Sequence, residues 1–316
     1  MRQAIMGVLL AGAAGMTSLG CAAMDVTAGG KHPLPRTGML VSAASLSGRL
    51  ADPNLVVLHV SKTPDSYAAG HIAGARLVRM EDIAAVRDGI PNELPPLASL
   101  TAFARRAGIT PASRIVIYDD ETGLLAARAY VTLDYMGLGD QAALLDGHLA
   151  HWKAAGRPLT KDVPNVAPSE LVPRPRWGII VPLQQMKDIV WARNNLNPPP
   201  VAIIDARQGD EYAGLKPGEG VVNPGHIPGA VNVFWMNNVA SAADPVMKPI
   251  PQLQKLYHDA GLRPGRMVIT YCRTGVQASH AYFTAKYLGY HVRIYDGSYI
   301  EWNAAGGTEV HTGPLP

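Results

Sequence analysis

Cys272 lies in a setting that favours a reactive thiol. It follows the short apolar run Met267–Tyr271, which is typical of a β-strand, and precedes the helical stretch Ala278–Leu288. A turn that leads into a helix presents backbone N–H groups without intrahelical partners, and such groups lower the pKa of a thiol placed among them. Arg273 adds a positive charge beside the sulfur. The sequence therefore predicts a nucleophilic thiolate at Cys272, in an anion cradle with a cationic rim.

An inert, buried side chain is the alternative interpretation of a lone cysteine. The chain has 2 cysteines, and the other one, Cys21, closes an N-terminal segment of the targeting type. The exported protein would have no cysteine pair for an internal disulfide, and an unpaired thiol in an oxidising compartment is a liability unless it is buried or used. The loop context of Cys272 favours use.

Two halves of the chain repeat the same motifs in the same order, which indicates the elements that position the cysteine. Each half has an apolar run and a Gly-His-Ile turn, then a second apolar run ending in a glycine loop, then an Asp-Gly segment that leads to Trp-x-Ala-Ala-Gly. The paired segments are Val56–Val78 with Val201–Ala230, Leu100–Gly123 with Leu253–Gly275, and Leu144–Arg157 with Ile294–Gly307.

The loop in the first half that corresponds to the cysteine loop has no thiol. Alignment through Gly123 and Gly275 places Asp120 opposite Cys272. An unpaired carboxylate is costly to bury, so a position that accepts both residue types is expected in a loop at the carboxyl end of a strand. In open α/β sheets, ligands bind in the crevice at that end.

Short Val- and Ile-rich runs alternate with apolar-periodic stretches of helical length in both halves. This alternation predicts an α/β fold with mostly parallel sheets. The expected strands are Leu55–Val60, Arg114–Tyr118, Val201–Asp205 and Met267–Tyr271.

Prolines mark the boundaries between these elements. The stretch Thr160–Arg176 contains four prolines, which extend neither a helix nor a central strand, and it is interpreted as a linker. A second proline-rich patch, Asn194–Pro200, separates the predicted helix Leu183–Arg193 from the strand that follows. The predicted divisions are a first domain over residues 36–162, a linker over 163–177 and a second domain over 178–316.

Composition excludes some classes of function. With 28 Lys and Arg against 25 Asp and Glu, the formal charge of +3 is too small to indicate nucleic-acid binding. The N-terminus has one charge at Arg2 and an apolar run over Ala4–Ala14, followed by small residues. This pattern predicts an export signal over residues 1–23, because the run is too short to span a bilayer.

The end of that signal leaves two outcomes open. The stretch before Cys21 resembles a lipobox, with Gly20 in the usual place but Ser18 where leucine is common. Removal of a secretory signal and lipidation of Cys21 are both consistent with it. Either outcome predicts an exported protein, periplasmic or lipid-anchored in the cell envelope.

Taken together, the motifs resemble those of the tandem-domain rhodanese-type sulfurtransferases, the thiosulfate and 3-mercaptopyruvate sulfurtransferase family. CRTGVQ, starting at Cys272, is similar to the family's catalytic loop. DAR at Asp205 with GHIPGAVN at Gly225 is similar to the signature in the first part of each domain, and YDGSYIEW at Tyr295 is similar to the closing one. The resemblance covers roughly positions 40 to 310, and absence of the cysteine from the first half is part of the family pattern.

This resemblance implies two tandem rhodanese-like α/β domains packed face to face, each a mostly parallel sheet with helices on both faces. The second domain would be catalytic and the first would help to wall the site. It also implies a persulfide mechanism: the Cys272 thiolate attacks the outer sulfur of a donor such as thiosulfate, sulfite leaves, and the persulfide passes sulfur to cyanide or another thiophilic acceptor. No metal or cofactor is implied.

The remaining site residues follow from the same resemblance. Asp205 and Arg207 are expected to form an ion pair that supports the loop. The anionic sulfur is expected to be held by the backbone N–H groups of the loop residues Arg273, Thr274, Gly275, Val276 and Gln277.

The sulfur donor is less sharply indicated. In this family a basic residue after the cysteine is typical of members that use thiosulfate as the donor, and small neutral residues are typical of those that use 3-mercaptopyruvate. Arg273 therefore favours thiosulfate. Glu211, however, stands where animal thiosulfate-type members have an arginine, and Thr274 stands where they have a basic residue. Arg174 and Arg176 in the linker could compensate.

Other notable residues are interpreted as structural. His71 and His226 occupy the same turn in the two halves, including the half without the cysteine, and Trp152 and Trp302 recur in the same way. His280 lies on an apolar helix face and is expected in the core.

Two rival functions were weighed against sulfur transfer. A phosphatase or arsenate reductase of related fold needs an arginine at the position of Ala278, which argues against it. A sulfur-carrier or binding module, which hands its persulfide to an acceptor protein, stays open. The expected partners are a small anionic sulfur donor and a thiophilic acceptor, with no nucleic acid and with a membrane only through a lipid anchor.

Overall fold

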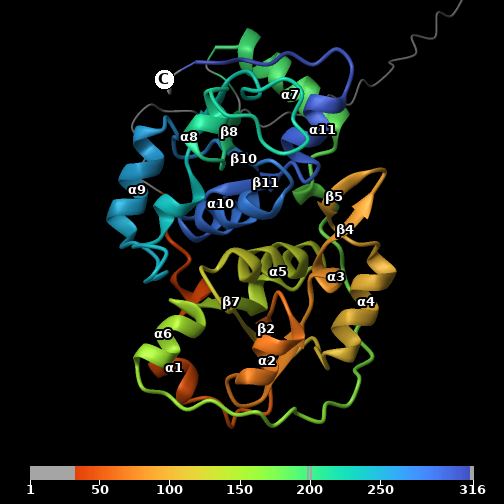
Figure 1. Cartoon of the computed structure of the whole chain (residues 1–316), viewed down its shortest axis with the longest axis vertical. Helices are drawn as coiled ribbons and strands as arrows, with labels where there is room; N and C mark the ends of the chain where they lie inside the picture. Colours follow the sequence, from red (N-terminus) through yellow and green to blue (C-terminus); the bar gives the residue numbers. More distant parts are fainter. Residues whose placement is uncertain (1–32, 198, 200, 314–316) are drawn as a thin grey trace, which may run out of the picture. The chain divides into compact units, whose positions relative to one another are not determined.

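The structure is a computed structural model that describes residues 33–197, 199 and 201–313, all of them in one compact unit (Figure 1). The predicted export signal and Cys21 lie outside the described residues. In the described part of the chain, no helix is long and apolar enough to cross a membrane.

The first half contains a five-stranded sheet in which every pair of neighbouring strands is parallel. Its spatial order is β1-β7-β6-β2-β3. The strands are β1 (Leu40–Val41), β2 (Leu55–Val60), β3 (Ala75–Val78), β6 (Arg114–Asp119) and β7 (Ala142–Leu145).

The second half contains a four-stranded sheet of the same kind, again wholly parallel, in the order β11-β10-β8-β9. Its strands are β8 (Val201–Asp205), β9 (Ala230–Asn232), β10 (Met267–Tyr271) and β11 (His291–Ile294). The predicted parallel sheets and all four predicted strands are therefore confirmed, with β6 one residue longer than expected. A separate antiparallel hairpin is formed by β4 (Ala85–Arg87) and β5 (Ile90–Glu93).

Helices cover both faces of each sheet. In the first half they are α1 (Ala43–Ser47), α2 (Pro64–Ala69), α3 (Met80–Ile83), α4 (Leu97–Arg106), α5 (Leu124–Tyr135) and α6 (His148–Ala154). In the second half they are α7 (Leu183–Asn195), α8 (Gly209–Tyr212), α9 (Ile250–Asp259), α10 (Val276–Tyr287) and α11 (Ser298–Ala304). Short 3₁₀ turns occur at Thr37–Met39, Gly139–Gln141, Trp177–Ile179 and Trp235–Asn238.

Alternation along the strands explains this layering. In β2, Val56 and Leu58 face one core whereas Val57 faces another, as expected for successive residues of a strand buried on both sides. Helices α1 and α6 close one face of the first sheet, and α7 and α11 close the corresponding face of the second. The opposite faces of the two sheets share one continuous core.

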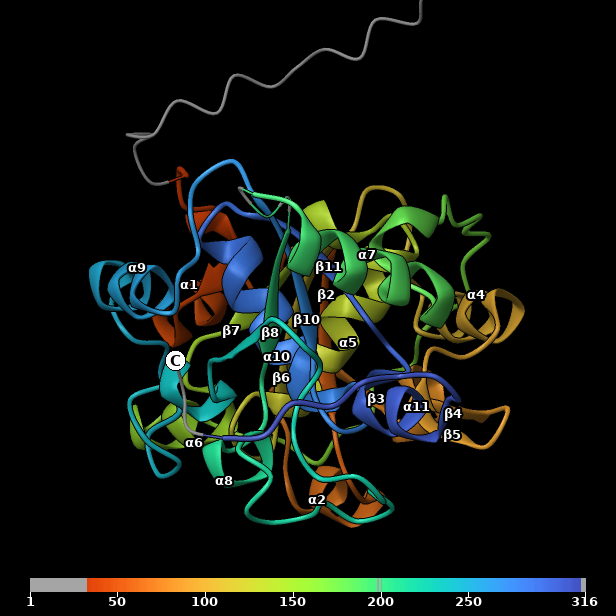
Figure 2. The ribbon, with the colours of Figure 1, turned by 90° about the horizontal axis from the view of Figure 1, so that it is seen from above.

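Helices α5 and α10 fill the middle of that shared core and pack against each other (Figures 1 and 2). Both helices are buried on nearly every side, which is why their sequences lack a polar face. Tyr282 and Lys286 of α10 also bind the buried carboxylate of Asp134 in α5, and Arg176 donates to the same carboxylate at 3.0 Å. Because each loop before these helices lies at the domain contact, the packing of α5 on α10 fixes where the two loops sit.

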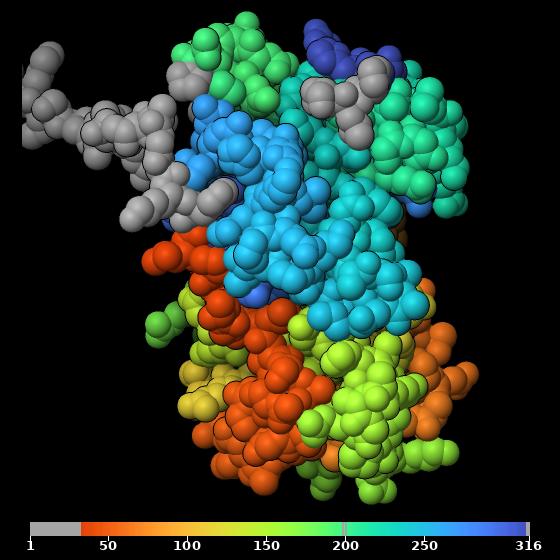
Figure 3. All heavy atoms as spheres, turned by 90° about the vertical axis from the view of Figure 1, so that its left-hand side faces the viewer, coloured from red at the N-terminus to blue at the C-terminus, as the bar shows by residue number. Residues whose placement is uncertain are grey.

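Each half also donates a backbone N–H to an aspartate of the other half across this contact. Leu94, just after β5, donates its N–H to Asp296 Oδ2 of the second half at 2.7 Å. In the other direction, Met247 donates its N–H to Asp146 Oδ1 of the first half at 2.9 Å. Figure 3 shows the light-blue atoms around α9 beside the yellow-green atoms of the first half. Each loop is therefore covered by a segment of the other half.

Candidate active site

The loop that carries Cys272 joins the end of β10 to the start of α10. Gly275 caps the helix with a φ of 91°, a backbone conformation that favours glycine. A Cβ at Gly275 would lie 3.0 Å from both the carbonyl and the Oδ1 of Asp296, so close packing also requires a glycine here. The Gly275 N–H donates to Cys272 Sγ at 3.1 Å, and only 1% of Cys272 is exposed. The loop therefore closes tightly around a buried sulfur.

Burial controls the resting charge of this thiol. It raises the pKa of Cys272, and the backbone N–H groups of Ala278, Thr274 and Gly275 oppose that rise. Asp205 raises the pKa further. The prediction that the thiol pKa is lowered is therefore wrong in its net direction. Of the predicted N–H groups, those of Thr274 and Gly275 face the sulfur, together with that of Ala278, which was not predicted.

Asp205 and Arg207 form the predicted ion pair. Arg207 Nη2 donates to Asp205 Oδ2 at 2.5 Å and to the carbonyl of Gly225 at 2.7 Å. The guanidinium carbon also lies 4.1 Å from the centre of the Tyr299 ring. Burial lowers the pKa of Arg207, but Asp205 outweighs it, so the net pKa is raised. The pair therefore stays charged and ties the end of β8 to the Gly-His-Ile turn.

The first half contributes directly to the loop. Asn92 Nδ2 donates to Thr274 Oγ1 at 3.1 Å, and the fully buried Arg128 donates to Asp296 Oδ1 at 2.5 Å. Sequence reasoning missed Asn92, Leu94 and Arg128. The repeated Asp-Gly of the two halves is the only signal for them, because its aspartates are the acceptors for the exchanged segments.

The corresponding loop of the first half identifies the residue that replaces the cysteine. The hydroxyls of Tyr118 and Tyr271 accept the N–H of the isoleucine in the two Gly-His-Ile turns, at 3.0 and 3.1 Å, so these tyrosines are equivalent. The next residue is Asp119 in one half and Cys272 in the other. Alignment of Asp120 with Cys272 is therefore wrong. The first loop has one more residue before its glycine, and that shifted the alignment.

Asp119 occupies an anion cradle of the same construction. Its Oδ1 accepts the N–H groups of Glu121 and Gly123 at 3.1 and 3.0 Å, and its Oδ2 accepts those of Leu125 and Ala126 at 3.0 and 3.2 Å. The carboxylate thus has four backbone donors in a site that is closed to solvent. This type of loop therefore holds a carboxylate by converging backbone N–H groups.

Comparison with known proteins agrees with this duplicated architecture. The model of the rhodanese-like domain matches residues 42–155 and again residues 188–305. The chain belongs to the rhodanese family.

Relatives over nearly the full length have several sulfur-transfer names. The chain is 33% identical over 293 residues to a "Probable 3-mercaptopyruvate sulfurtransferase" of Pseudomonas aeruginosa, covering 88% of this chain and 99% of the relative. It is 32% identical to the sulfur carrier protein TtuD of Thermus thermophilus, covering 87% and 97%. It is 30% identical to a thiosulfate sulfurtransferase of Pseudomonas aeruginosa, covering 86% and 96%. Sulfur transfer is common to these names, whereas the donor differs.

Solved structures show the same fold at lower identity. The wild-type structure of EanB superposes with a TM-score of 0.76 at 22% identity, covering 90% of this chain and 71% of that chain. YnjE superposes with a TM-score of 0.76 at 22% identity, covering 89% and 70%.

Within this rhodanese fold, the rim of the site contains an opposed pair of charges. Arg273 and Glu211 both pack on Gly218, where an added Cβ would lie 2.7 Å from Arg273 Cδ and 2.9 Å from Glu211 Oε2. Glu211 Oε2 is buried without a hydrogen-bond partner among the described residues. The suggestion that Arg176 offsets this carboxylate is wrong, because its guanidinium is bound to Asp134 and Asp140.

The residues that were interpreted as structural are packed as expected. His71 and His226 stack on tyrosines of their own halves, with ring centres 3.8 and 3.7 Å apart. Trp152 and Trp302 are buried, and each indole N–H donates to a backbone carbonyl. His280 is buried in the core, and burial lowers its pKa to about 3. Among the described residues, no cluster of three or more His, Cys, Asp or Glu could hold a metal ion.

Proposed function

We propose that this protein is a thiosulfate sulfurtransferase that carries sulfane sulfur as a persulfide on Cys272. The observation that supports it best is the cradle at the end of β10, where backbone N–H groups converge on one buried thiol. Membership of the rhodanese family and the sulfur-transfer names of its relatives support the reaction class.

Two steps account for turnover. The Cys272 thiolate attacks the outer sulfur of thiosulfate, a new S–S bond forms to the cysteine, and the sulfur–sulfur bond of thiosulfate breaks with its electron pair leaving on sulfite. Cyanide or another thiophilic acceptor then attacks the outer sulfur of the persulfide. Thiocyanate leaves, and the cysteine thiolate is regenerated without a net redox change.

The Asp119 loop supports this use of the Cys272 loop. In the first half the cradle satisfies four N–H groups with one carboxylate. Cys272 Sγ accepts the Gly275 N–H at 3.1 Å and also faces the N–H groups of Thr274 and Ala278. The terminal sulfur of a persulfide adds a negative atom about 2 Å beyond Sγ, within reach of the remaining N–H groups. Stabilisation of that anion offsets the unfavourable burial of the resting thiolate.

Arg273 favours thiosulfate as the donor, because a sulfonate benefits from a cation at the rim. Glu211 opposes it, because its carboxylate lies beside Arg273 and repels an anion. We therefore expect Glu211→Gln to raise kcat/KM for thiosulfate by about threefold to tenfold, on the scale of one screened charge interaction. Glu121→Gln, at an exposed carboxylate of the first half, is the matched control and should leave kcat/KM unchanged.

The decisive experiment compares the purified protein with its Cys272→Ser variant. Thiosulfate and cyanide are supplied together and thiocyanate is measured, with 3-mercaptopyruvate run in parallel. Thiocyanate from the wild type alone supports the proposal, and the donor with the larger kcat/KM identifies the substrate. If 3-mercaptopyruvate is the better donor, the alternative specificity replaces the one proposed.

A persulfide carrier is the second candidate, favoured by the similarity to a protein named as a sulfur carrier. Intact mass after incubation with thiosulfate separates the two. A gain of one sulfur without thiocyanate formation indicates a carrier that loads but does not turn over with small acceptors. An unloaded thiol together with no thiocyanate rejects both. We further propose that the protein is exported, periplasmic or lipid-anchored through Cys21, which N-terminal sequencing and mass analysis of the protein from cell-envelope fractions would test.

A further inference from the structure

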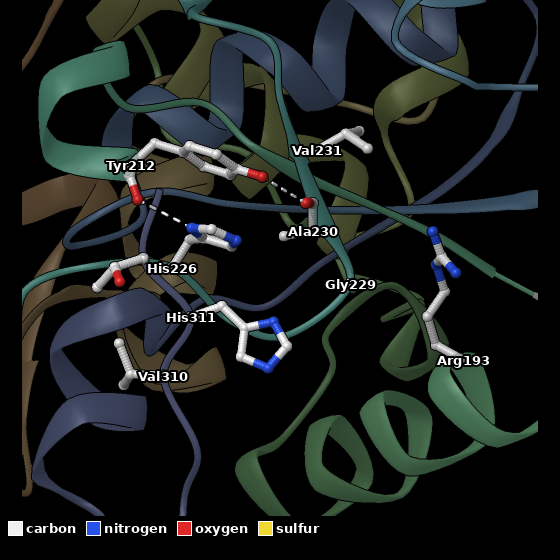
Figure 4. A pocket seen from close by; sticks show the side chains of 9 residues that line it. Arg193, Tyr212, His226, Gly229, Ala230, Val231, Val310 and His311 are labelled. Carbon is white, nitrogen blue, oxygen red and sulfur yellow. Dashed lines mark hydrogen bonds between the residues drawn. The ribbon is translucent and has the colours of Figure 1, made fainter. Parts of the chain in front are cut away.

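The second half of the molecule contains a cavity that is not lined by the Cys272 loop. Its volume is about 580 Å³, and its walls come from α7, α8, β9 and the segment that ends at Thr312 (Figure 4). None of the described residues that line it is acidic, whereas Arg193, His226 and His311 all contribute to its wall. The two imidazoles lie on one side of Gly229 and Arg193 lies on the other (Figure 4). The cavity is therefore lined by one guanidinium and two imidazoles.

His226 differs from its duplicate in one contact. In both halves the histidine Nδ1 lies near a tyrosine carbonyl, at 3.0 Å for His71 and 2.9 Å for His226. The other ring nitrogen of His71 is also occupied, at 3.2 Å from the carbonyl of Asp162. In the described part of the chain, His226 Nε2 has no such partner. Because Nδ1 donates to the Tyr212 carbonyl, Nε2 of the neutral ring is an acceptor, and burial lowers the pKa of His226 and favours that neutral form. Nε2 can therefore accept from a hydroxyl group of a ligand in the cavity.

The residue that pairs with the histidine through its backbone also differs between the two halves. His71 pairs through its backbone with Thr160, whereas His226 pairs with His311. The His311 ring stands edge-on to the His226 ring, with centres 6.1 Å apart. The second half therefore presents two adjacent imidazoles where the first half has one, and His311 is exposed to solvent.

Arg193 adds a guanidinium that has no ion pair among the described residues. Its Nε is buried without a hydrogen-bond partner. Burial lowers the pKa of Arg193, and the charge of Arg266 lowers it further. Both arginines line a smaller adjoining cavity of about 50 Å³. Two cations placed together without an acid destabilise each other, and a bound anion would relieve that repulsion.

Gly229 is what allows Arg193 to reach the cavity. Its φ is 78°, and a Cβ there would lie 2.6 Å from Asn194 Oδ1 and 3.1 Å from Arg193 Cγ. The equivalent Gly74 of the first half has no atom within 4 Å of that position. Close approach of the α7 end to this turn is therefore a feature of the second half only.

The form of the ligand is restricted by β9, which is the edge strand of its sheet. An exposed edge can bind an extended peptide through its free backbone groups. At this edge, however, the carbonyl of Ala230 accepts the Tyr212 hydroxyl at 2.8 Å, and the Ala230 N–H donates to the carbonyl of Ile227 at 3.0 Å. The backbone groups next to the cavity are already used, which favours a small molecule over a peptide strand.

We propose that this cavity binds a small ligand bearing a phosphate or sulfonate group, with Arg193 and His311 as its polar contacts to the anion. The site is separate from the persulfide chemistry, and the proposal does not depend on the identity of the sulfur donor. Arg266 contributes charge from the adjoining cavity.

Calorimetric titration of the reduced, full-length protein tests this site, with inorganic phosphate and methanesulfonate as separate probes. Arg193→Gln is expected to weaken the binding of both probes by at least about tenfold, and His311→Gln by about threefold, in line with the loss of a charged and of a weaker hydrogen bond. Arg114→Gln and His291→Gln remove an exposed arginine and an exposed histidine from strand ends elsewhere and should change nothing.

Each result decides the question. A saturable heat that both cavity variants weaken supports the site, and the tighter probe shows whether phosphate or sulfonate is preferred. No saturable heat with either probe overturns the proposal, as does binding that Arg193→Gln and His311→Gln leave unchanged. His311 is exposed, so its variant stays informative if Arg193→Gln fails to fold. Thiocyanate formation should be equal in all four variants, so this proposal and the sulfurtransferase proposal fail separately.

Discussion

The loop after β6 and the loop after β10 have the same architecture around different side chains. Both begin after a tyrosine whose hydroxyl binds the Gly-His-Ile turn, and both end in a glycine with positive φ before a buried helix. The first encloses the carboxylate of Asp119, which accepts four N–H groups. The second encloses the thiol of Cys272, which accepts the N–H of Gly275 and faces those of Thr274 and Ala278.

On the proposed mechanism, this difference separates a filled anion site from one that is filled only when Cys272 carries a second sulfur. A carboxylate is charged at neutral pH and saturates the cradle permanently, so the first loop has nothing to exchange. Burial raises the pKa of the Cys272 thiol, and a neutral sulfur accepts the surrounding N–H groups more weakly than a charged one would. The first half thus preserves the geometry of the site as a structural element, and the second half retains room for chemistry.

Cys272→Asp would make the second loop resemble the first, and it carries the largest expected effect. Thiocyanate formation should fall by at least about a thousandfold, because no nucleophile remains. The protein should nevertheless fold, since the carboxylate can accept the N–H groups of Thr274, Gly275 and Ala278 as Asp119 accepts theirs. Activity and urea unfolding would be measured beside Cys272→Ser. A variant that retains turnover, or one far less stable than Cys272→Ser, contradicts the equivalence of the two loops.

Asp119→Ala tests the other side of the comparison. Four N–H groups lose their acceptor, two of them in buried hydrogen bonds, so the free energy of unfolding should fall by about 2 to 4 kcal/mol. Because Asp119 is remote in sequence and role from the thiol, kcat of the folded variant should stay within about twofold of the wild type. Urea denaturation gives the first quantity and thiocyanate formation the second. Asp65→Ala, in the exposed first turn of α2, serves as the control. Unchanged stability would show that the carboxylate is not needed to hold the loop.

The sequence predicted the parallel sheets, the position of Cys272 in a loop and the ion pair of Asp205 with Arg207. Each of these depends on a local pattern or on a repeated motif. Sequence reasoning misplaced the counterpart of the cysteine, since a one-residue difference in loop length is invisible until the strand partners of Tyr118 and Tyr271 are known. It also predicted the wrong direction for the thiol pKa. Helix N-terminal donors can be read from the chain, but the extent of burial that opposes them depends on packing between the halves.

Contacts between the halves could not be predicted from the sequence, because they also depend on packing. The bond from Asn92 to Thr274 joins residues 182 positions apart, and it exists only because α5 packs on α10. Nothing in the residues around Asn92 marks it as a neighbour of the Cys272 loop. Duplicated motifs indicate that two domains exist, whereas the segments exchanged between them depend on the geometry of the shared core.

Asn92→Gly measures what the first half contributes to the second loop. Glycine tolerates the φ of 61° at this position, so the substitution removes the amide with little backbone strain. Loss of one hydrogen bond to Thr274 should lower kcat by about threefold to tenfold through poorer loop positioning, with KM for the donor nearly unchanged. Asp88→Gly, at the other positive-φ residue of the hairpin that is not a glycine, is the control for backbone effects. An effect on KM alone would indicate that Asn92 acts in donor binding instead.

The smallest expected effect is on the pH dependence of stability, and it concerns Glu93. This residue lies in the segment that contacts the second half near the Cys272 loop. Burial, then Asp296 and Glu301, raise the pKa of Glu93 to about 7, with Arg87 opposing and Asp88 adding to the rise. At the equivalent place, before Met247, the other segment has the uncharged Val246. The active side of the contact is therefore the one that responds to pH.

The direction of this response follows from proton linkage. The folded protein holds the Glu93 proton more tightly than the unfolded chain, whose glutamate has a pKa near 4.5, so stability should fall as pH rises from about 4.5 to about 7 and then level off. Glu93→Gln cannot ionise and should flatten that fall. Urea midpoints would be compared between about pH 5 and pH 8, with Glu81→Gln as the control at an exposed carboxyl of α3. Identical pH profiles for Glu93→Gln and the wild type would show that solvent reaches Glu93 freely and that the contact does not sense its charge.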